Sequence, residues 1–210
     1  IPRRHVPRRS LPMEPMQTEE RRLTVERNVP VDALYMAFHM CSRNHPDYYA
    51  FDMLSDLLSS GRSSRFVQHL VQDKQIFNSI DAYISGSIDN GLFHIVGKPA
   101  PEKTLEEAEK AIWEELALLT EGSIDENELE KVKNRYESEQ IFNNLNYLNV
   151  ATNLAYFELI GKAEDINTEV EKYRSVTQEQ IKRAAKQTFL PENCSVLYYK
   201  AAAKGASHTP

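Results

Sequence analysis

Histidines and cysteines are the side chains best suited to bind a metal ion, and their spacing in this chain argues against such a site. The six histidines are scattered, and none has a second histidine within one helical turn. A zinc site on a helix needs two ligands about one turn apart, with a general base beside them. No HxxxH, HxxEH, HExxH or CxxC pattern occurs. The sequence therefore predicts no catalytic residue and no metal ligand.

The two cysteines, Cys41 and Cys194, lie in apolar runs that are typical of strands. Two buried free thiols are the simplest interpretation of this setting. A disulfide requires both residues to lie on neighbouring strands, which the sequence leaves open.

The acidic and hydroxyl side chains also form no catalytic group. Asp52 and Asp56 lie one turn apart on a predicted helix, where like charges repel and need water or a cation, water being the commoner answer. Ser63 is expected to cap the helix that follows it. A further run of glutamates is expected to form a solvated helix face: 106, 107, 109, 114 and 115.

Composition indicates an ordinary globular chain of one domain or two small repeats. It has 210 residues, of which 41% are hydrophobic and 27% charged. The formal net charge of −6 argues against general nucleic-acid binding, which needs a basic face. No apolar run approaches the length of a membrane span, so we expect neither nucleic acid nor a membrane as a partner.

The first half of the chain predicts strands, helices and a hairpin. Four prolines indicate an extended interdomain linker over residues 1–20. Strands follow at 21–29 and 33–41, the second apolar on both faces and therefore central, with His39 as a core residue. Helices are expected at 46–60 and 63–73. Alternating isoleucines from Ile76 to Ile88, then Asp89-Asn90-Gly91, predict an antiparallel hairpin.

The second half is predicted to be helical. Capping boxes start helices at Thr104 with Glu107, Asp125 with Glu128, and Thr177 with Gln180. One long helix is expected over 126–160 and another over 164–173. Residues 194–201 read as a last strand, and 202–210 as a disordered or vector-derived tail. This order predicts an α+β fold, a largely antiparallel sheet with helices packed on one face, over residues 21–201.

Two stretches carry a family resemblance: "DYYAFDMLSDLLSSGRSSRFVQHLVQDKQIFNSIDAYIS" and "LEEAEKAIWEELALLTEGSIDENELEKVKNRYESE". Both resemble the C-terminal half of pitrilysin-type (insulinase-like) zinc metallopeptidases of the bacterial processing-peptidase kind. The resemblance implies a mitochondrial-processing-peptidase-like metallohydrolase fold. Only the N-terminal half of such proteins carries the inverted zinc motif HxxEH. Its positions fall here on Asp52, Ser55 and Asp56, which do not make that site, so zinc is expected only in the missing half.

The resemblance also implies a degenerate substrate clamp. Active relatives use an arginine and a tyrosine within "SSRLxxxLRxxxxxxYS". Aligned without gaps, "SSRFVQHLVQDKQIFNS" places Val71 at the arginine and Asn78 at the tyrosine. Valine has no side-chain donor and asparagine is shorter than a phenol. This departure suggests that a second pitrilysin-type subunit supplies the clamp.

By this resemblance the chain is the non-catalytic half of a zinc metalloendopeptidase, partnered by its homologous N-terminal half. It would form one wall of a chamber for unfolded peptides, with Tyr83, Ser85 and His94 as candidate substrate-binding residues. This half alone is not expected to be an enzyme. Two alternatives stay open: a structural subunit like the core proteins of respiratory complexes, without peptidase activity, and a stand-alone peptide-binding module. Substrate, compartment and oligomeric state are not determined by the sequence.

Overall fold

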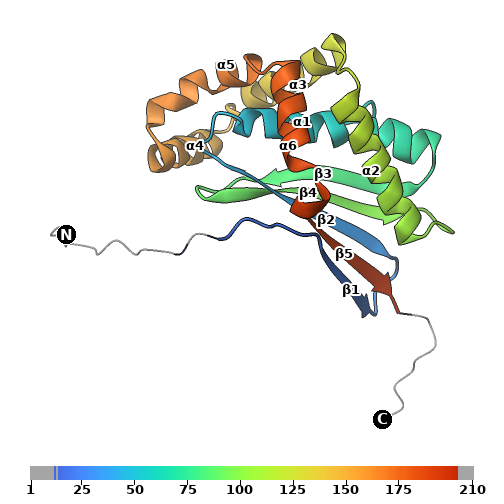
Figure 1. The fold of residues 1–210 in the computed structure, drawn as a ribbon. Helices are drawn as coiled ribbons and strands as arrows, with labels where there is room; N and C mark the ends of the chain where they lie inside the picture. The colour runs from blue at the N-terminus through green and yellow to red at the C-terminus, as the bar shows by residue number, and fades with distance from the viewer. Residues whose placement is uncertain (1–11, 13, 203–210) are drawn as a thin grey trace.

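The computed structural model describes Pro12 and residues 14–202, which form a sheet and a layer of helices (Figure 1). The sheet has five strands in the order β1-β5-β2-β4-β3. Only the β1–β5 pair is parallel, and the other pairs are antiparallel. The strands are β1 Arg21–Arg27, β2 Ala33–Ser42, β3 Phe77–Ser85, β4 Asn90–Pro99 and β5 Cys194–Ala201.

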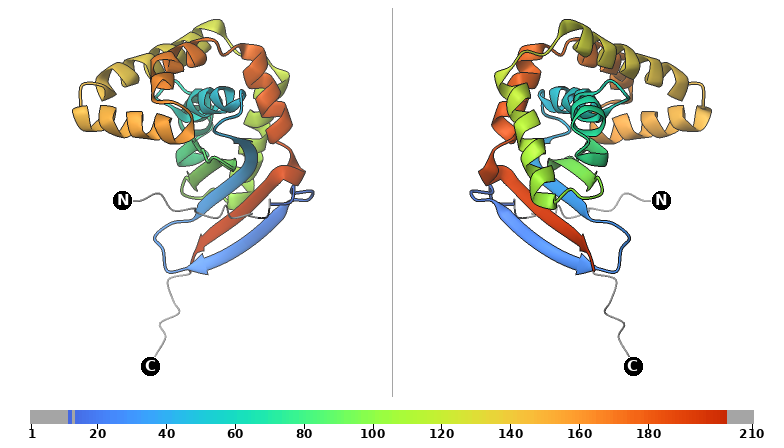
Figure 2. Two further views of the ribbon diagram at one scale, coloured as in Figure 1. Left: turned by 90° about the vertical axis from the view of Figure 1, so that its left-hand side faces the viewer. Right: turned by 90° about the vertical axis from the view of Figure 1, so that its right-hand side faces the viewer.

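The helices cover one face of the sheet and leave the opposite face without a helix (Figure 2). The α-helices are α1 Tyr48–Ser59, α2 Leu105–Glu121, α3 Glu126–Asn143, α4 Tyr147–Ile160, α5 Glu169–Arg174 and α6 Gln178–Thr188. Shorter turns are the π-helix η1 Phe66–Asp73 and the 3₁₀-helices η2 Ala163–Thr168 and η3 Pro191–Asn193. This arrangement confirms the predicted α+β class with helices packed on one face.

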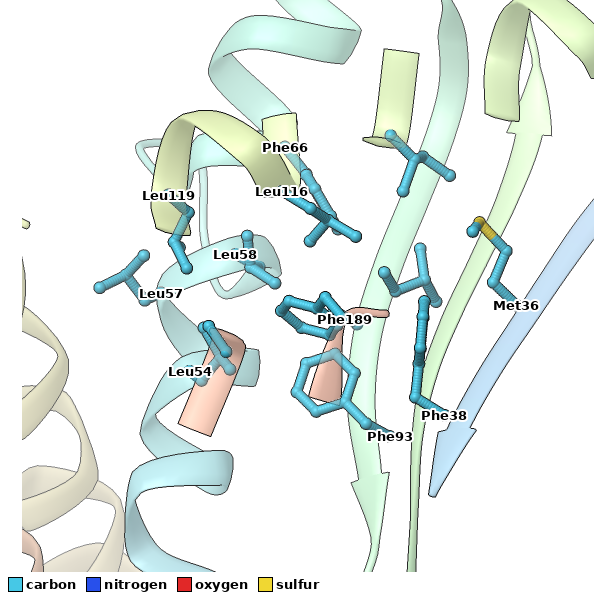
Figure 3. Close-up of a cluster of buried hydrophobic side chains, with 14 of the residues drawn as sticks. Met36, Phe38, Leu54, Leu57, Leu58, Phe66, Phe93, Leu116, Leu119 and Phe189 are labelled. Carbon is cyan, nitrogen blue, oxygen red and sulfur yellow. The ribbon is translucent and has the colours of Figure 1, made fainter. Parts of the chain in front are cut away.

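The core lies between the sheet and the helices and is built on the central strand β2. Alternate residues of β2 point into it, and Leu34, Met36 and Phe38 are at most 1% exposed. The rings of Phe38 and Phe93 each meet Phe189 edge to face at 5.1 Å (Figure 3). Burying one such side chain contributes about 1.5–3 kcal/mol, so this contact joins the sheet firmly to the end of α6. His39, expected in the core, instead lies half-buried on the opposite face.

Two turns follow directly from residue chemistry. Gly61 ends α1 with φ of 89°, a conformation that residues with a Cβ atom avoid. The predicted β3–β4 hairpin is confirmed, but its loop spans residues 86–89. Ile88 lies in that loop and is 59% exposed, so the predicted alternation ends before it. Gly91 belongs to β4, where a Cβ would meet the Ser85 carbonyl oxygen at 2.5 Å.

The capping predictions are partly confirmed. Thr104 and Thr177 form complete capping boxes at the starts of α2 and α6. Asp125 accepts from the Asn127 N–H, but Glu128 does not complete a box because its carboxylate pairs with Arg65. The predicted cap by Ser63 is wrong, because its hydroxyl accepts a 2.7 Å hydrogen bond from Lys131 Nζ and η1 has no side-chain cap.

The prediction of one helix over 126–160 is also wrong. The chain leaves the helix at residues 144–146, and Asn146 restarts it as α4 by accepting from the Leu148 N–H. Asparagine competes well for backbone donors outside helices, which explains a break within an Asn-rich run. The helix expected over 164–173 is a 3₁₀ turn followed by α5.

The predicted domain limits stay predictions. The expected linker over 1–20 and tail over 202–210 lie mostly outside the described residues, and residues 14–20 contain no helix or strand. Within the described part of the chain, no helix has the length and apolar character that a bilayer crossing requires.

Candidate functional site

The uncovered face of the sheet brings together three of the predicted site residues. Tyr83 on β3 and His94 on β4 are register partners, and their rings stack at 4.9 Å between centroids. Ser85 Oγ lies 3.0 Å from His94 Nε2. Burial lowers the pKa of His94, which favours the neutral imidazole at pH 7. The three side chains therefore form one neutral, hydrogen-bonding surface on the hairpin.

A hollow of about 340 Å³ lies next to this surface, and β1, β5, β2 and β4 all contribute to it. His94 borders both the hollow and the hairpin surface. Arg21 and Arg22 border the hollow at β1, and the Arg22 guanidinium pairs with Glu20 and Glu109. Its mainly apolar walls suit an uncharged side chain of an extended peptide. They include Leu23, Tyr35, Ala37, Val96 and Leu197.

The two degenerate clamp positions lie elsewhere. Val71, on η1, is partly buried and packs against the hydrophobic core. Asn78 is exposed on β3, at a register shift between Phe77 and Ser79. Val71 therefore offers no side-chain hydrogen-bond donor at the arginine position of the clamp. What each residue does toward a substrate stays a prediction.

Helix α1 does not fit a zinc ion at the positions that the family resemblance marks. Asp52 accepts a 2.5 Å hydrogen bond from the Tyr173 hydroxyl, and Ser55 Oγ donates to the Asp52 carbonyl at 2.8 Å. Burial raises the pKa of Asp52. Burial, together with the charge of Asp52, raises the pKa of Asp56 to about 6. Among the residues that the structure describes, no three His, Cys, Asp or Glu side chains are grouped so that they could hold a metal ion.

The expectation that water solvates Asp52 is therefore wrong, because a tyrosine cluster covers it. The Tyr173 ring stacks on Tyr136 at 3.6 Å and meets Tyr49 edge to face at 5.0 Å. Arg43 pairs with Glu169 in the same region, and both residues are buried. The sequence signal for this cluster is the tyrosine pair at 48–49 together with the later Tyr136 and Tyr173, but nothing in the sequence shows that they meet.

Two glutamates of the predicted solvated face are buried instead. Glu109 on α2 accepts hydrogen bonds from Arg22, from Tyr198 at 2.6 Å and from Trp113 at 3.3 Å. Burial alone would raise the pKa of Glu109, but the bonds from Arg22 and Tyr198 outweigh it and lower that pKa. Glu115, 1% exposed, pairs with His69 Nδ1 at 2.8 Å. Both carboxylates thus hold elements together rather than face water.

The cysteines are free, as the sequence indicated. Cys194 is buried and Cys41 half-buried. Burial raises the pKa of Cys41 to about 11 and that of Cys194 to about 12. Both therefore stay as unreactive thiols at neutral pH.

These features define an α+β domain whose described residues contain no group of side chains suited to bind a metal ion. A sequence comparison names the family: the description "Peptidase M16 inactive domain" matches residues 1–136. The chain belongs to this family. The predicted resemblance to the non-zinc half of pitrilysin-type peptidases is confirmed.

Relatives carry the word protease in their names. The chain is 25% identical over 179 residues to the uncharacterized zinc protease YmxG of Bacillus subtilis, covering 84% of this chain and 43% of YmxG. It is 23% identical over 188 residues to the zinc protease PqqE of Helicobacter pylori, covering 89% and 42%. A crystal structure of a protease from Helicobacter pylori superposes with a TM-score of 0.84 at 23% identity, covering 90% and 46%. The chain thus spans less than half the length of these relatives.

Proposed function

We propose that this chain is the non-catalytic half of a zinc-dependent metalloendopeptidase and forms one wall of a chamber that binds unfolded peptides. The family description and the names of the relatives support the peptidase class. Asp52 is already bonded to Tyr173, and Ser55 stands where the motif has its general-base glutamate, so this half does not fit zinc. The zinc would be held by the homologous N-terminal half, where it would polarise the scissile carbonyl and activate water.

One observation carries the role as a wall: the sheet face opposite the helices combines an apolar hollow with the Tyr83–His94 surface. A domain that worked alone would gain stability by covering this face. A chamber wall instead needs this sheet face to stay accessible to the substrate. An extended peptide can lie on such a face, because hydrogen bonds along its main chain favour shape over sequence.

The side chains at the clamp positions support a second subunit. Val71 cannot donate a hydrogen bond, and Asn78 is exposed but short. A chain with these residues needs another pitrilysin-type subunit to hold the substrate backbone near the zinc.

The test uses the full-length natural protein together with its second pitrilysin-type subunit, and an unfolded peptide substrate. Tyr83→Ala removes a stacked ring from the proposed wall. We expect KM to rise about fivefold at constant kcat, as loss of roughly 1 kcal/mol of contact made equally in the ground and transition states predicts. Ile88→Ala, in the loop of the same hairpin, is the control and should leave KM unchanged.

Three outcomes would count against the proposal. An unchanged KM in Tyr83→Ala would remove this face from the binding site. A zinc-loaded full-length protein that cleaves no unfolded peptide even together with its second pitrilysin-type subunit would favour the structural-subunit alternative. Tight peptide binding by the 210-residue chain alone would favour the stand-alone module.

A further inference from the structure

The tip of α3 and the whole of α4 form an apolar projection, which we call the α4 arm (residues 140–160). No charged side chain occurs from Gln140 to Phe157, although 27% of the whole chain is charged. In Figure 2 these helices reach sideways past the edge of the sheet. The arm therefore carries a single charged side chain, Glu158 near its end, and lies at the margin of the helical layer.

The apolar side chains of the arm are exposed rather than packed. On α4 only Phe157 is buried. Half of the large hydrophobic residues exposed in the described chain belong to the arm. They are Ile141 (60%), Phe142 (71%), Leu145 (73%), Tyr147 (91%), Leu148 (74%), Leu154 (39%), Tyr156 (41%) and Leu159 (75%).

The apolar residues of α4 do not form one stripe. At 3.6 residues per turn, the exposed Tyr147, Leu148 and Tyr156 point in different directions around the helix. Among the described elements, α4 packs extensively only on η2. A helix that is apolar on all sides is normally buried in a larger core. Its 14 residues are too few to cross a bilayer, which takes about 20. The exposed area thus marks a surface that another protein body covers.

We infer that the α4 arm is the docking surface for the homologous metal-binding half of the peptidase, an inference that rests on the proposed function. The relatives' lengths support this occupant, since 54–58% of each lies beyond the part that this chain matches. A half on the same polypeptide is held at high effective concentration. The matching groove on that half is apolar and uncharged, because a charged groove would lose its hydration against residues 140–157.

The chemistry of the arm disfavours two other occupants. A helix lying on a membrane surface carries lysines or arginines on a polar face, and α4 has none. Two copies of α4 paired about a twofold axis need a single apolar seam on each helix. The exposed side chains around α4 instead suit a groove that encloses the helix. The flanking charges are already paired within this domain, as in Arg135–Glu139 and Arg174–Glu137, and form a polar rim.

Hydrogen exchange of the α4 amides tests this inference. The 210-residue chain and the full-length natural protein are compared, each as wild type and as Leu148→Asp. We expect exchange of Tyr147–Ile160 to be at least tenfold slower in the full-length protein, and Leu148→Asp to abolish that difference. Leu118→Asp is the matched control, since Leu118 is 58% exposed on α2, outside the arm. It should leave the protection unchanged.

Other results would overturn the inference. Equal exchange in both wild-type proteins would mean that the other half does not cover the arm. Sedimentation of the 210-residue chain as a dimer that Leu148→Asp dissociates would assign the arm to a second copy. Binding to phosphatidylcholine vesicles that the same substitution abolishes would assign it to a membrane. Peptidase activity is measured in parallel, so that protected α4 amides without activity would reject only the proposed function.

Discussion

The hydroxyl of Tyr173 donates a 2.5 Å hydrogen bond to Asp52 Oδ2, joining α5 to α1 across 121 positions of the chain. Asp52 lies where the family resemblance places a zinc ligand, so a tyrosine hydroxyl meets the carboxylate that a metal ion would otherwise satisfy. Burial and the neighbouring Asp52 carboxylate also raise the pKa of Tyr173 far above its ordinary value. The phenol therefore remains a proton donor at every physiological pH.

Tyr173→Phe should destabilise the domain by about 1–3 kcal/mol, because it leaves a buried carboxylate without its donor. Urea unfolding followed by circular dichroism measures this change. Tyr147→Phe is the control, since Tyr147 is 91% exposed, and should change stability by less than about 0.5 kcal/mol. Equal effects of the two substitutions would contradict a stabilising role for the Tyr173 hydroxyl.

Stability should rise as the pH falls from 7 to 5, in part through Asp56. Its pKa is raised to about 6 in the folded state, so the folded chain binds a proton in this range before the unfolded chain does. The resulting gain is about 1 kcal/mol between pH 7 and pH 5. Asp56→Asn should remove that part of the dependence.

Asp89→Asn, in the exposed β3–β4 loop, is the control for the pH series and should keep the wild-type dependence. Unfolding curves at pH 5, 6 and 7 give the comparison. A parallel pH dependence in wild type and Asp56→Asn would rule Asp56 out as its source.

The 210-residue chain should bind no stoichiometric zinc. Elemental analysis after dialysis against a zinc salt and then against metal-free buffer gives the measurement, and the full-length natural protein serves as the positive control. One zinc per chain that is lost on Asp52→Ala would show that α1 binds the metal after all.

Glu109→Gln should destabilise the domain by about 1–2 kcal/mol, since a carboxylate that accepts from Arg22, Tyr198 and Trp113 becomes a weaker, neutral acceptor. The loss should be smallest at low pH, because the lowered pKa of Glu109 makes its contribution disappear as the carboxylate is protonated. Glu114→Gln, on the exposed side of the same helix, should change stability by less than about 0.5 kcal/mol. Thermal melts at pH 7 and pH 3 would show whether the two variants differ as expected.

The strands and most helix ends could be predicted because their signals are local. The two-faced apolar pattern of residues 33–41 identified a central strand, and Thr104 and Thr177 marked helix starts correctly. The expectation that α1 binds no zinc rests on side-chain types and stays a prediction. Each of these signals lies within a few residues of the feature that it specifies.

The partners of charged residues could not be predicted, because they come from distant segments. In the sequence, Glu109 cannot be distinguished from the solvated glutamates near it. Only the fold places Arg22, 87 residues earlier, beside its carboxylate. Glu115 is buried against His69 for the same reason. The break before α4 depends on the Asn146 side chain, which accepts a hydrogen bond from the Leu148 N–H. Helix periodicity does not show this local bond. The Tyr83–His94 contact likewise required the exact pairing of β3 with β4.

The position of β5 between β1 and β2 has a consequence for biosynthesis (Figure 1). Both of its neighbours leave the ribosome early, whereas Cys194–Ala201 emerges after all the helices have been made. At about 5–20 residues per second, β1 and β2 are synthesised on the order of 10–30 s before β5, the strand that pairs with both. A nascent chain cut short before Cys194 would expose two strand edges, which makes it a natural client for a chaperone.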